Sequence, residues 1–373
     1  MGIFLENASH MVLEKNRRIT KKLLDWYRRH RRDLPWRRTR DPYKIWISEI
    51  MLQQTQVKTT VPYYRRFLAR FPDIYALAAA DLQDVLKLWE GLGYYGRARN
   101  MHRAAKEIVA THDGAIPDDM DKIKNLPGVG DYIAAAVLSI AYNQPHPVVD
   151  GNVKRVFARL FRIDAPVNVQ RSYSVFKKKS EELMPPDSPA DYNQALMELG
   201  ALVCRPATPL CAQCPLRADC LAFEGGSTAE FPKKIKRKPL PEHTLVIAVV
   251  VKNNRVLLTR RQEQGLLGGL WEFPNGRLGP GESPEAACPR VVKTKLNLTT
   301  RIEARVAGIR HAYTHFKIKA DVFVCRHVGG RVRLNGPADY RWIALDEIDA
   351  YPLPKANHKF LPALRRVLNP KVA

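Results

Sequence analysis

Four of the six cysteines fall in one short segment, CRPATPLCAQCPLRADC, which constrains the fold more than any other feature of the sequence. They are Cys204, Cys211, Cys214 and Cys220, separated by six, two and five residues. Four thiols in so short a span indicate the ligands of one inorganic centre. Zinc accepts four cysteines, but its structural sites usually pair two C-x-x-C knuckles, and this segment has one. A 4Fe-4S cluster also takes four cysteine thiolates, so the spacing alone leaves both centres open.

A second segment, LPGVGDYIAAA at 126–136, places two glycines before an alanine-rich run. Gly128 and Gly130 let the loop turn tightly, so that the first amides of the following helix are free and point outward. Such amides form an anion site, although a plain turn between two helices has the same signature. The formal net charge of +24 favours nucleic acid over a membrane as the partner.

The length of 373 residues exceeds one ordinary core and predicts two domains. The first part reads as successive helices, and in DPYKIWISEIMLQQTQV Asp41 fits an N-cap with Pro42 at the first helical position. The basic run KKIKRKPLPEHT then predicts a linker, and beyond it LVIAVVV, RVLLTR, FKIKADVFVC and YRWIAL predict strands. We therefore expect an all-α domain over 1–226, a linker over 227–243 and an α+β domain over 244–373.

The apolar runs indicate where the chain resides. The longest, 245–251, suits a buried strand and is too short to span a membrane. The first residues carry Glu6 and Glu14 and lack the uninterrupted apolar core of a signal peptide. We expect the chain to stay inside the cell with reduced cysteines, in the cytoplasm of a bacterium or in the nucleus or mitochondrion of a eukaryote.

LPGVGDYIAAA, followed by VVDGNVKRV and then by the cysteine spacing, resembles the helix-hairpin-helix DNA glycosylases of the endonuclease III superfamily. WISEIMLQQTQV, GLGYYGRARN and WEFPNG narrow the resemblance to the MutY-type adenine DNA glycosylases. The resemblance extends from about Leu34 to the last strands, with the motifs in order. It implies a helical glycosylase domain with one 4Fe-4S cluster on the four cysteines and a Nudix-like C-terminal domain. It also implies that the amides after Gly128 and Gly130 hold a DNA phosphate.

Breaking the bond between a base and deoxyribose requires an acid for the leaving base and a carboxylate for the cationic sugar. The resemblance assigns these roles to Glu49 and Asp150. Glu49 lies beside Trp46 and Ile50, and burial there would raise its pKa and keep it protonated. Taken alone, Glu49 would read as a solvated helix residue and Asp150 as a helix cap, and the cap can coexist with catalysis. Whether Asp150 bonds to the sugar or only pairs with its charge stays open.

Tyr132 and Asn152 match family positions that support the aspartate. In relatives that also cut the strand, a lysine occupies the position of Tyr132 and forms a Schiff base with the sugar. Tyrosine cannot supply that amine, so the resemblance implies base excision without efficient strand cleavage. Asp131 stands where a basic residue is usual, which predicts a slightly weaker phosphate contact.

The target base must leave the duplex stack before it can enter a pocket. The resemblance places these residues around the extruded adenine and the opened stack: Trp36, Arg37, Gln54, Leu92, Tyr94 and Gln194. A glutamine such as Gln194 can both donate to and accept from the adenine edge. The ring of Tyr94 can stack on any base, whereas we interpret Tyr95 as a core residue.

In the C-terminal part, Gly276, Glu282 and Arg290 keep the opening spacing of a Nudix box. The continuation, RVVKTK, lacks the glutamates that hold divalent metal ions for nucleotide hydrolysis. The domain therefore resembles a Nudix fold without its hydrolase site. In the family this domain recognises 8-oxoguanine opposite adenine.

The segment HAYTHFKI carries the loop that matches this recognition role. Tyr313, Thr314 and His315 stand where the family usually has Phe, Ser and His. Thr314 keeps the hydroxyl that would contact the damaged base, although its extra methyl could alter the fit. A metal site at His311 and His315 is disfavoured because no acid or cysteine lies near them in the sequence.

We predict a monofunctional adenine DNA glycosylase that acts, as a monomer with one 4Fe-4S cluster, on double-stranded DNA containing adenine opposite 8-oxoguanine or guanine. The alternatives are a pyrimidine-lesion glycosylase with lyase activity, a nonenzymatic DNA-binding protein and, less favoured, a nucleotide hydrolase.

Overall fold

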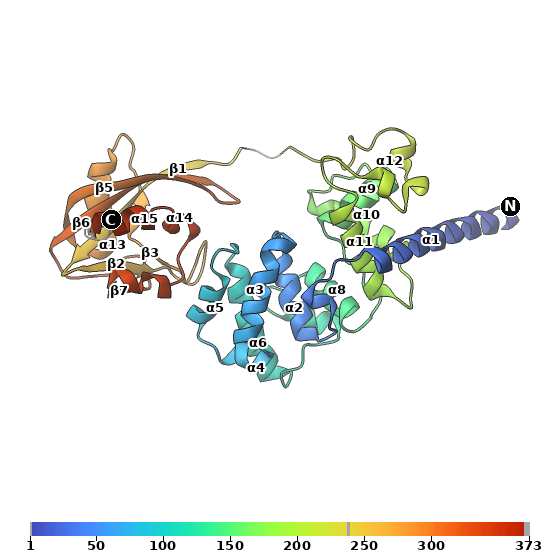
Figure 1. Ribbon diagram of the computed structural model, residues 1–373, viewed down its shortest axis with the longest axis horizontal. Coiled ribbons are helices and arrows are strands. Elements are labelled where there is room, and N and C mark those ends of the chain that lie inside the picture. Colours follow the sequence, from blue (N-terminus) through green and yellow to red (C-terminus); the bar gives the residue numbers. More distant parts are fainter. Residues whose placement is uncertain (1, 237–238, 369–373) are drawn as a thin grey trace. The chain divides into compact units, whose positions relative to one another are not determined.

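The computed structural model describes residues 2–236 and 239–368, with the side chains of 2–9 left out of the description. The chain divides into two compact units (Figure 1). The first unit contains the residues up to Ala78 and those from Arg103 to the linker. The second unit contains Ala79–His102 and the residues after the linker. A segment from the helical part of the sequence therefore belongs to the body that contains the strands.

The first unit is all helical. Its elements are α1 (Gly2–His30), η1 (Pro35–Arg37), α2 (Pro42–Leu52), α3 (Val57–Arg70), α4 (Ile74–Ala79), α7 (Met120–Asn125), α8 (Asp131–Ile140), α9 (Gly151–Leu160), η2 (Gln170–Ser172), α10 (Tyr173–Leu183), α11 (Pro189–Leu202), η3 (Cys211–Gln213), η4 (Arg217–Asp219) and α12 (Leu221–Glu224). The helix α6 (Gly96–Thr111) spans the boundary between the units. Among the described residues, no helix has the length and apolarity needed to cross a membrane.

Caps and small residues fix the helices that carry the site. Asp41 accepts hydrogen bonds from the amides of Tyr43 and Lys44, with Pro42 in the first turn, so the predicted start of α2 is confirmed. The alanines of α8 are buried, and Ala135 and Ala136 share a small core with Ile45 of α2. Small side chains on α8 let its backbone approach α2 closely, which places the side chains of both helices beside one cavity.

A larger core joins the C-terminal half of α1 to α9, α10 and α11, with Leu23, Tyr27, Phe157, Tyr192 and Leu199 among its buried members. The partly buried Cys204, Cys214 and Cys220 pack against it.

The second unit is a layered α+β fold, as the sequence predicted. Its elements are α5 (Leu82–Trp89), the start of α6, β1 (Glu242–Lys252), β2 (Arg255–Arg260), β3 (Trp271–Glu272), β4 (Asn275–Arg277), α13 (Pro284–Leu296), β5 (Thr299–Ala312), β6 (Lys317–Gly329), β7 (Asp339–Ile343), η5 (Leu345–Ala350), α14 (Lys355–His358) and α15 (Leu361–Leu368). The strands form one sheet of order β3-β2-β1-β6-β5, in which β4 also pairs with β1 and β7 with β2. The pairing of β1 with β6 is parallel, and the other pairs are antiparallel.

Alternation along β1 puts an apolar core on each face of the sheet. Val246, Ala248 and Val250 pack with α13, whereas Ile247 and Val249 join a core that includes residues of α14 and α15. The four strands predicted from the sequence are present as β1, β2, β6 and β7.

Candidate active site

A cavity of about 140 Å³ lies within the helical unit, where η1, α2, α8, α11 and the start of α9 converge. The predicted site residues that line it are Trp36, Arg37, Glu49, Tyr132, Asp150, Asn152 and Gln194. Gln54 is not among the lining residues, although its neighbour Thr55 is. Residues distant in sequence thus bring an acid, a second carboxylate and a polar amide to one cavity.

Glu49 is the titratable acid of this cavity. Its side chain lies on the buried side of α2 and only 4% of the residue is exposed. Burial raises the pKa of Glu49 to about 7, and the charge of Asp150 adds to the rise. The hydroxyl of Tyr132 opposes the rise by donating to Glu49 Oε2 over 2.7 Å. The expectation that burial raises this pKa is confirmed, and near neutral pH Glu49 can both give and accept a proton.

Tyr132 is held as a neutral phenol. Burial raises its pKa well above the ordinary value, and the neighbouring charges of Glu49 and Asp150 act in the same direction. The side chain therefore donates a hydrogen bond to Glu49 and offers no amine to a substrate.

Asp150 caps α9 and faces the cavity at the same time. Its Oδ1 accepts from the Val153 amide over 2.7 Å, and its Oδ2 accepts from Asn152 Nδ2 over 2.8 Å. Burial raises the pKa of Asp150, while these two hydrogen bonds favour the carboxylate. The cap predicted from the sequence is thus present, and it fixes the orientation of the carboxylate that lines the cavity.

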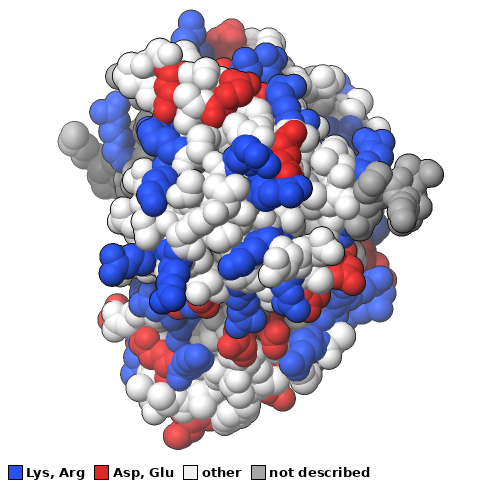
Figure 2. Space-filling model, turned by 90° about the vertical axis from the view of Figure 1, so that its left-hand side faces the viewer, with Lys and Arg blue, Asp and Glu red and all other residues white. Residues whose placement is uncertain are grey.

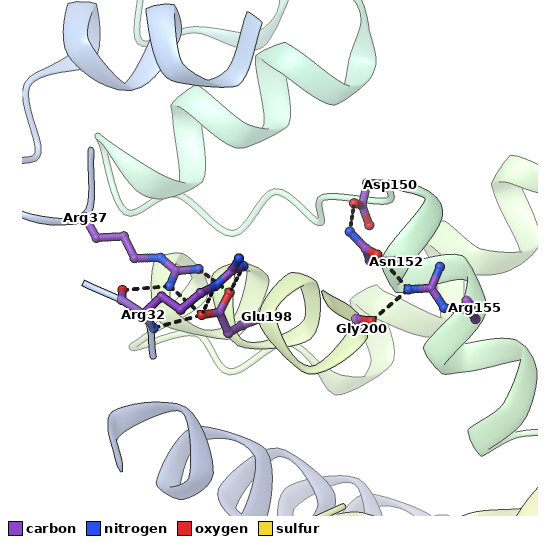
Figure 3. A network of polar contacts seen from close by, with 7 residues as sticks. All are labelled: Arg32, Arg37, Asp150, Asn152, Arg155, Glu198 and Gly200. Carbon is purple, nitrogen blue, oxygen red and sulfur yellow. Dashed lines mark hydrogen bonds and ion pairs between the residues drawn. The ribbon is translucent and has the colours of Figure 1, made fainter. Parts of the chain in front are cut away.

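A chain of hydrogen bonds runs from Asp150 through Asn152 and Arg155 to Gly200 (Figure 3), and Arg155 extends it to the cysteine loop. Arg155 Nη2 donates to Asn152 Oδ1 over 2.7 Å and to the Gly200 carbonyl over 2.8 Å, and Arg155 Nε donates to the Cys204 carbonyl over 2.7 Å. A Cβ atom at Gly200 would lie 2.6 Å from Asn152 Cβ, so the close approach of α11 to α9 requires glycine. The sequence analysis assigned no role to Gly200 or to Arg155, although Arg155 lies within the VVDGNVKRV segment.

Glu198 is a second buried carboxylate of the cavity, but it is already paired (Figure 3). Arg37 donates from both terminal nitrogens to the two Glu198 oxygens, each over 2.9 Å, and Arg32 Nε donates to Oε1 over 2.9 Å. Burial alone would raise the pKa of Glu198, but these bonds lower it to about 2. Glu198 therefore stays ionised and anchors Arg37 at the cavity wall. No pattern in the sequence predicts this pair, because an isolated glutamate on a helix is usually solvated.

The hairpin between α7 and α8 has the geometry expected of an anion site. Gly128 has φ +78°, in the left-handed region that favours glycine, and Gly130 is the N-cap of α8. No side chain caps the start of this helix, so no capping side chain accepts a hydrogen bond from its first amides. Asp131 forms an ion pair with Lys124 at 2.6 Å, which offsets its negative charge.

The four clustered cysteines line one cavity of about 30 Å³, together with Arg159, Leu199 and other residues. Arg159 Nη1 lies 3.4 Å from Cys204 Sγ. Burial and, to a smaller extent, the neighbouring cysteines raise the pKa of Cys214 to about 12, so the sulfurs lie close enough to influence one another. In the part of the chain that the structure describes, no three His, Cys, Asp or Glu side chains are arranged as a finished metal site. The donor set and its apolar surroundings nevertheless fit a four-thiolate centre.

The remaining predicted residues belong to the second unit. Leu92 and Tyr94 lie in the loop between α5 and α6, and Leu92 is buried. Thr314 lies in the turn between β5 and β6, and its hydroxyl donates to the Tyr94 hydroxyl over 2.6 Å. Tyr95 is 4% exposed, which confirms its interpretation as a core residue.

Two carboxylates, one in the remnant of the Nudix box and one just before it, form ion pairs with arginine. Glu282 accepts from Arg290 Nη2 over 2.5 Å and from the Gly279 amide over 2.7 Å, and these bonds lower its pKa to about 2. Glu272 accepts from Arg261 Nη1 at both oxygens, over 2.9 and 2.8 Å. Both carboxylates are thus paired with arginine.

On one face of the molecule (Figure 2), positive side chains alternate with negative ones. Figure 2 shows one face of the molecule, on which Lys and Arg side chains are scattered among Asp and Glu instead of merging into one patch. The net charge therefore does not by itself identify a DNA-binding surface on this face.

Two family comparisons agree with the two folds. Residues 47–186 match the HhH-GPD superfamily base excision DNA repair protein family, and residues 246–363 match the NUDIX domain.

A solved thermostable thymine-DNA glycosylase is 29% identical with a TM-score of 0.53, covering 57% of this chain and 98% of that one. A non-covalent endonuclease III–DNA complex gives a TM-score of 0.50 at 22% identity, covering 57% and 97%, which shows the shared fold. Fold and site define a DNA N-glycosylase of the helix-hairpin-helix class joined to a Nudix-like domain.

The closer assignment comes from whole-chain similarity. The adenine DNA glycosylase of Mus musculus is 34% identical over 87% of this chain and 73% of its own length. That of Buchnera aphidicola subsp. Acyrthosiphon pisum is 33% identical over 82% and 85%. The Arabidopsis thaliana enzyme is 36% identical over 83% of this chain, which spans 57% of that longer protein. The chain belongs to the adenine DNA glycosylase family.

Proposed function

We propose that this protein hydrolyses the N-glycosidic bond of adenine mispaired with 8-oxoguanine, and more weakly with guanine, and so initiates base excision repair. The observation that carries the proposal is the pair of carboxyl groups in one cavity, Glu49 with a pKa of about 7 and Asp150 held by hydrogen bonds. An acid and a carboxylate with separate environments are what departure of a base from deoxyribose requires.

In the proposed reaction, protonated Glu49 donates its proton to a ring nitrogen of adenine. The bond from C1′ to the base nitrogen breaks, and its electron pair leaves with the base. Asp150 balances the positive charge that develops on the sugar, either as an ion pair or through a transient bond to C1′. Water then adds its oxygen to C1′, any bond from Asp150 to C1′ breaks and returns its electron pair to the carboxylate, and the Glu49 carboxylate accepts the proton that the water releases.

Tyr132 and Asn152 act by holding these two groups. Tyr132 donates to Glu49 and holds the acid in the cavity that Asp150 also lines, while Asn152 fixes one Asp150 oxygen. Because the phenol cannot form a Schiff base, the proposed enzyme is monofunctional and leaves the DNA strand intact.

We propose the following contacts with double-stranded DNA: adenine with Trp36, Arg37 and Gln194; the opened stack and partner base with Gln54, Leu92 and Tyr94; a phosphate with the amides after Gly128 and Gly130; and 8-oxoguanine with Thr314. The proposed domains are 1–226 for glycosylase chemistry, 227–243 as linker and 244–373 for recognition of the lesion, with residues 79–102 of the first packed in one unit with the last. The protein would act as a monomer on genomic DNA in the cytoplasm of a bacterium, or in the nucleus or mitochondrion of a eukaryote.

Cys204, Cys211, Cys214 and Cys220 would hold one 4Fe-4S cluster, since all four line one cavity. When bound, the cluster would crosslink the loop and contribute no acid, base or nucleophile to the reaction. Iron and sulfide analysis of the purified protein distinguishes this cluster from zinc.

The proposal is tested by separating excision from binding. Asp150→Asn and Glu49→Gln should each lower the single-turnover rate of adenine release by at least about a hundredfold. Both variants should still bind a duplex that contains adenine opposite 8-oxoguanine, and Asp187→Asn, at an exposed carboxylate of the same unit, serves as the control. Unchanged excision in both active-site variants would contradict the assignment.

A further inference from the structure

The loop that carries Leu92 and Tyr94 is fastened to the Nudix-like fold. Residues 79–102 form one compact unit with the chain after the linker. On one side of the loop, Gln83 Nε2 donates to the Gly269 carbonyl over 3.1 Å and Trp271 Nε1 donates to Gln83 Oε1 over 2.9 Å. On the other side, Arg99 Nη1 donates to the Gly268 carbonyl over 2.8 Å. The backbone of this loop is therefore positioned by elements of the second unit.

Glu90 is the centre of this attachment. It follows the last residue of α5 and directly precedes the loop, and its side chain is 16% exposed. Oε1 accepts from the Leu353 amide over 2.7 Å and lies 3.0 Å from His358 Nε2, while Oε2 accepts from Lys87 Nζ over 2.5 Å. Although burial alone would raise the pKa of the Glu90 carboxyl, its three hydrogen bonds lower it. The carboxylate thus ties the end of α5 to the segment that leads into α14.

A second set of hydrogen bonds joins the same segment to the loop itself. Lys87 Nζ also donates to the Tyr351 carbonyl over 3.2 Å, and the Gly91 amide donates to the Tyr95 hydroxyl over 3.2 Å. The Tyr95 hydroxyl in turn donates to the Leu353 carbonyl over 3.5 Å. The backbone of Leu353 therefore contacts both ends of the loop. Its amide binds Glu90 at the start of the loop, and its carbonyl binds Tyr95 at the end.

The loop has little freedom of its own to compensate for a lost anchor. Gly91 and Gly93 have φ of +95° and +74°, and Tyr94 holds φ +50°, a region that tyrosine rarely occupies. Such a conformation persists only where its surroundings fix it. Loss of Glu90 would therefore displace the Tyr94 ring while the glycosylase cavity keeps its structure.

We infer that Glu90, with Lys87, Leu353 and His358, is the positioning group that sets how strongly the enzyme discriminates 8-oxoguanine from guanine opposite adenine. The inference rests on the proposed function, because it assigns Tyr94 to the opened stack. Glu90 touches no reacting atom and acts through the loop.

The test compares Glu90→Ala and Glu90→Gln with wild type in single-turnover excision of adenine opposite 8-oxoguanine and opposite guanine. Hydrogen bonds to a charged group are the strong ones, so Glu90→Ala should lower the ratio of the two rates about tenfold or more. Glu90→Gln keeps an oxygen for the Leu353 amide and should recover part of the ratio. Glu285→Ala, at an exposed carboxylate of α13, should leave the ratio unchanged.

Two further measurements separate positioning from a general loss of structure. In a Tyr94→Ala background, Glu90→Ala should produce no additional loss of the ratio, since both changes act on the same ring. 2-Aminopurine placed beside the 8-oxoguanine should show a smaller fluorescence increase on binding of Glu90→Ala than of wild type. Equal loss of excision on both duplexes, or full additivity with Tyr94→Ala, would overturn the inference. A wild-type enzyme without adenine excision would instead refute the proposed function.

Discussion

Glu49→Gln should stabilise the protein at alkaline pH while it abolishes excision, because the native cavity holds an acid whose pKa is raised. Burial brings the pKa of Glu49 from its ordinary value of 4.5 to about 7. Between these two values the native state binds more protons than the unfolded chain, so the free energy of unfolding decreases as the pH rises through this window. Integrated over the whole shift, the decrease is about 3 kcal/mol. The glutamine of the variant stays neutral and avoids this decrease.

Urea unfolding followed by circular dichroism measures the effect at about pH 5, near the lower end of the window, and at about pH 8, above its upper end. Wild type should lose stability relative to Glu49→Gln on going to the higher pH, and Asp187→Asn should behave as wild type does. In parallel, wild-type excision should decline as the pH rises above about 7 with the loss of protonated Glu49. If Glu49→Gln shows no stability advantage at the higher pH, burial does not hold the acid in its protonated form and the reasoning fails.

Three more predictions follow from particular contacts. Tyr132→Lys places an amine beside Asp150, so borohydride should trap a covalent complex with the DNA that wild type does not give; no trapping would contradict the proposed place of Tyr132. Gly200→Ala inserts a Cβ 2.6 Å from that of Asn152, and we expect a loss of about 1–3 kcal/mol in the free energy of unfolding together with slower excision. Wild-type stability in this variant would show that α9 and α11 can separate freely. Thr314→Ala should reduce the preference for 8-oxoguanine over guanine and leave excision opposite guanine within about twofold; an unchanged preference in competition assays would remove Thr314 from lesion recognition.

Local rules of the sequence predicted much of the fold. Asp41 before Pro42, and Asp150 before a helix, are capping signals that act within a few residues, and both caps are present. The apolar runs that became β1 and β2 were visible because those strands are buried on both faces. The strand β5 was missed because the prediction relied on apolar runs, whereas in TTRIEARVAGIRHA charged residues alternate with single apolar ones, the pattern of a half-exposed strand.

What depends on tertiary contact could not be predicted. Glu198 becomes a fixed anion only because Arg32 and Arg37 converge on it from another part of the chain. Arg155 looks like any helix arginine until its guanidinium reaches Gly200 and Cys204. The packing of residues 79–102 with the strand-containing unit depends on contacts between distant residues, among them Gln83 with Gly269 and Glu90 with Leu353, which no local pattern in the sequence reveals. The motifs thus predicted the groups proposed to react, and the structure shows which side chains hold them.

The central claim is tested most directly by single-turnover incubation of the iron-containing enzyme with duplexes that hold adenine opposite 8-oxoguanine, guanine or thymine. Free adenine and strand breaks are measured separately, with and without heating in alkali. The account predicts adenine release from the first two duplexes, fastest from the first, and strand breaks only after alkali. Absence of adenine release from all three, or strand cleavage without alkali, would contradict a monofunctional adenine glycosylase.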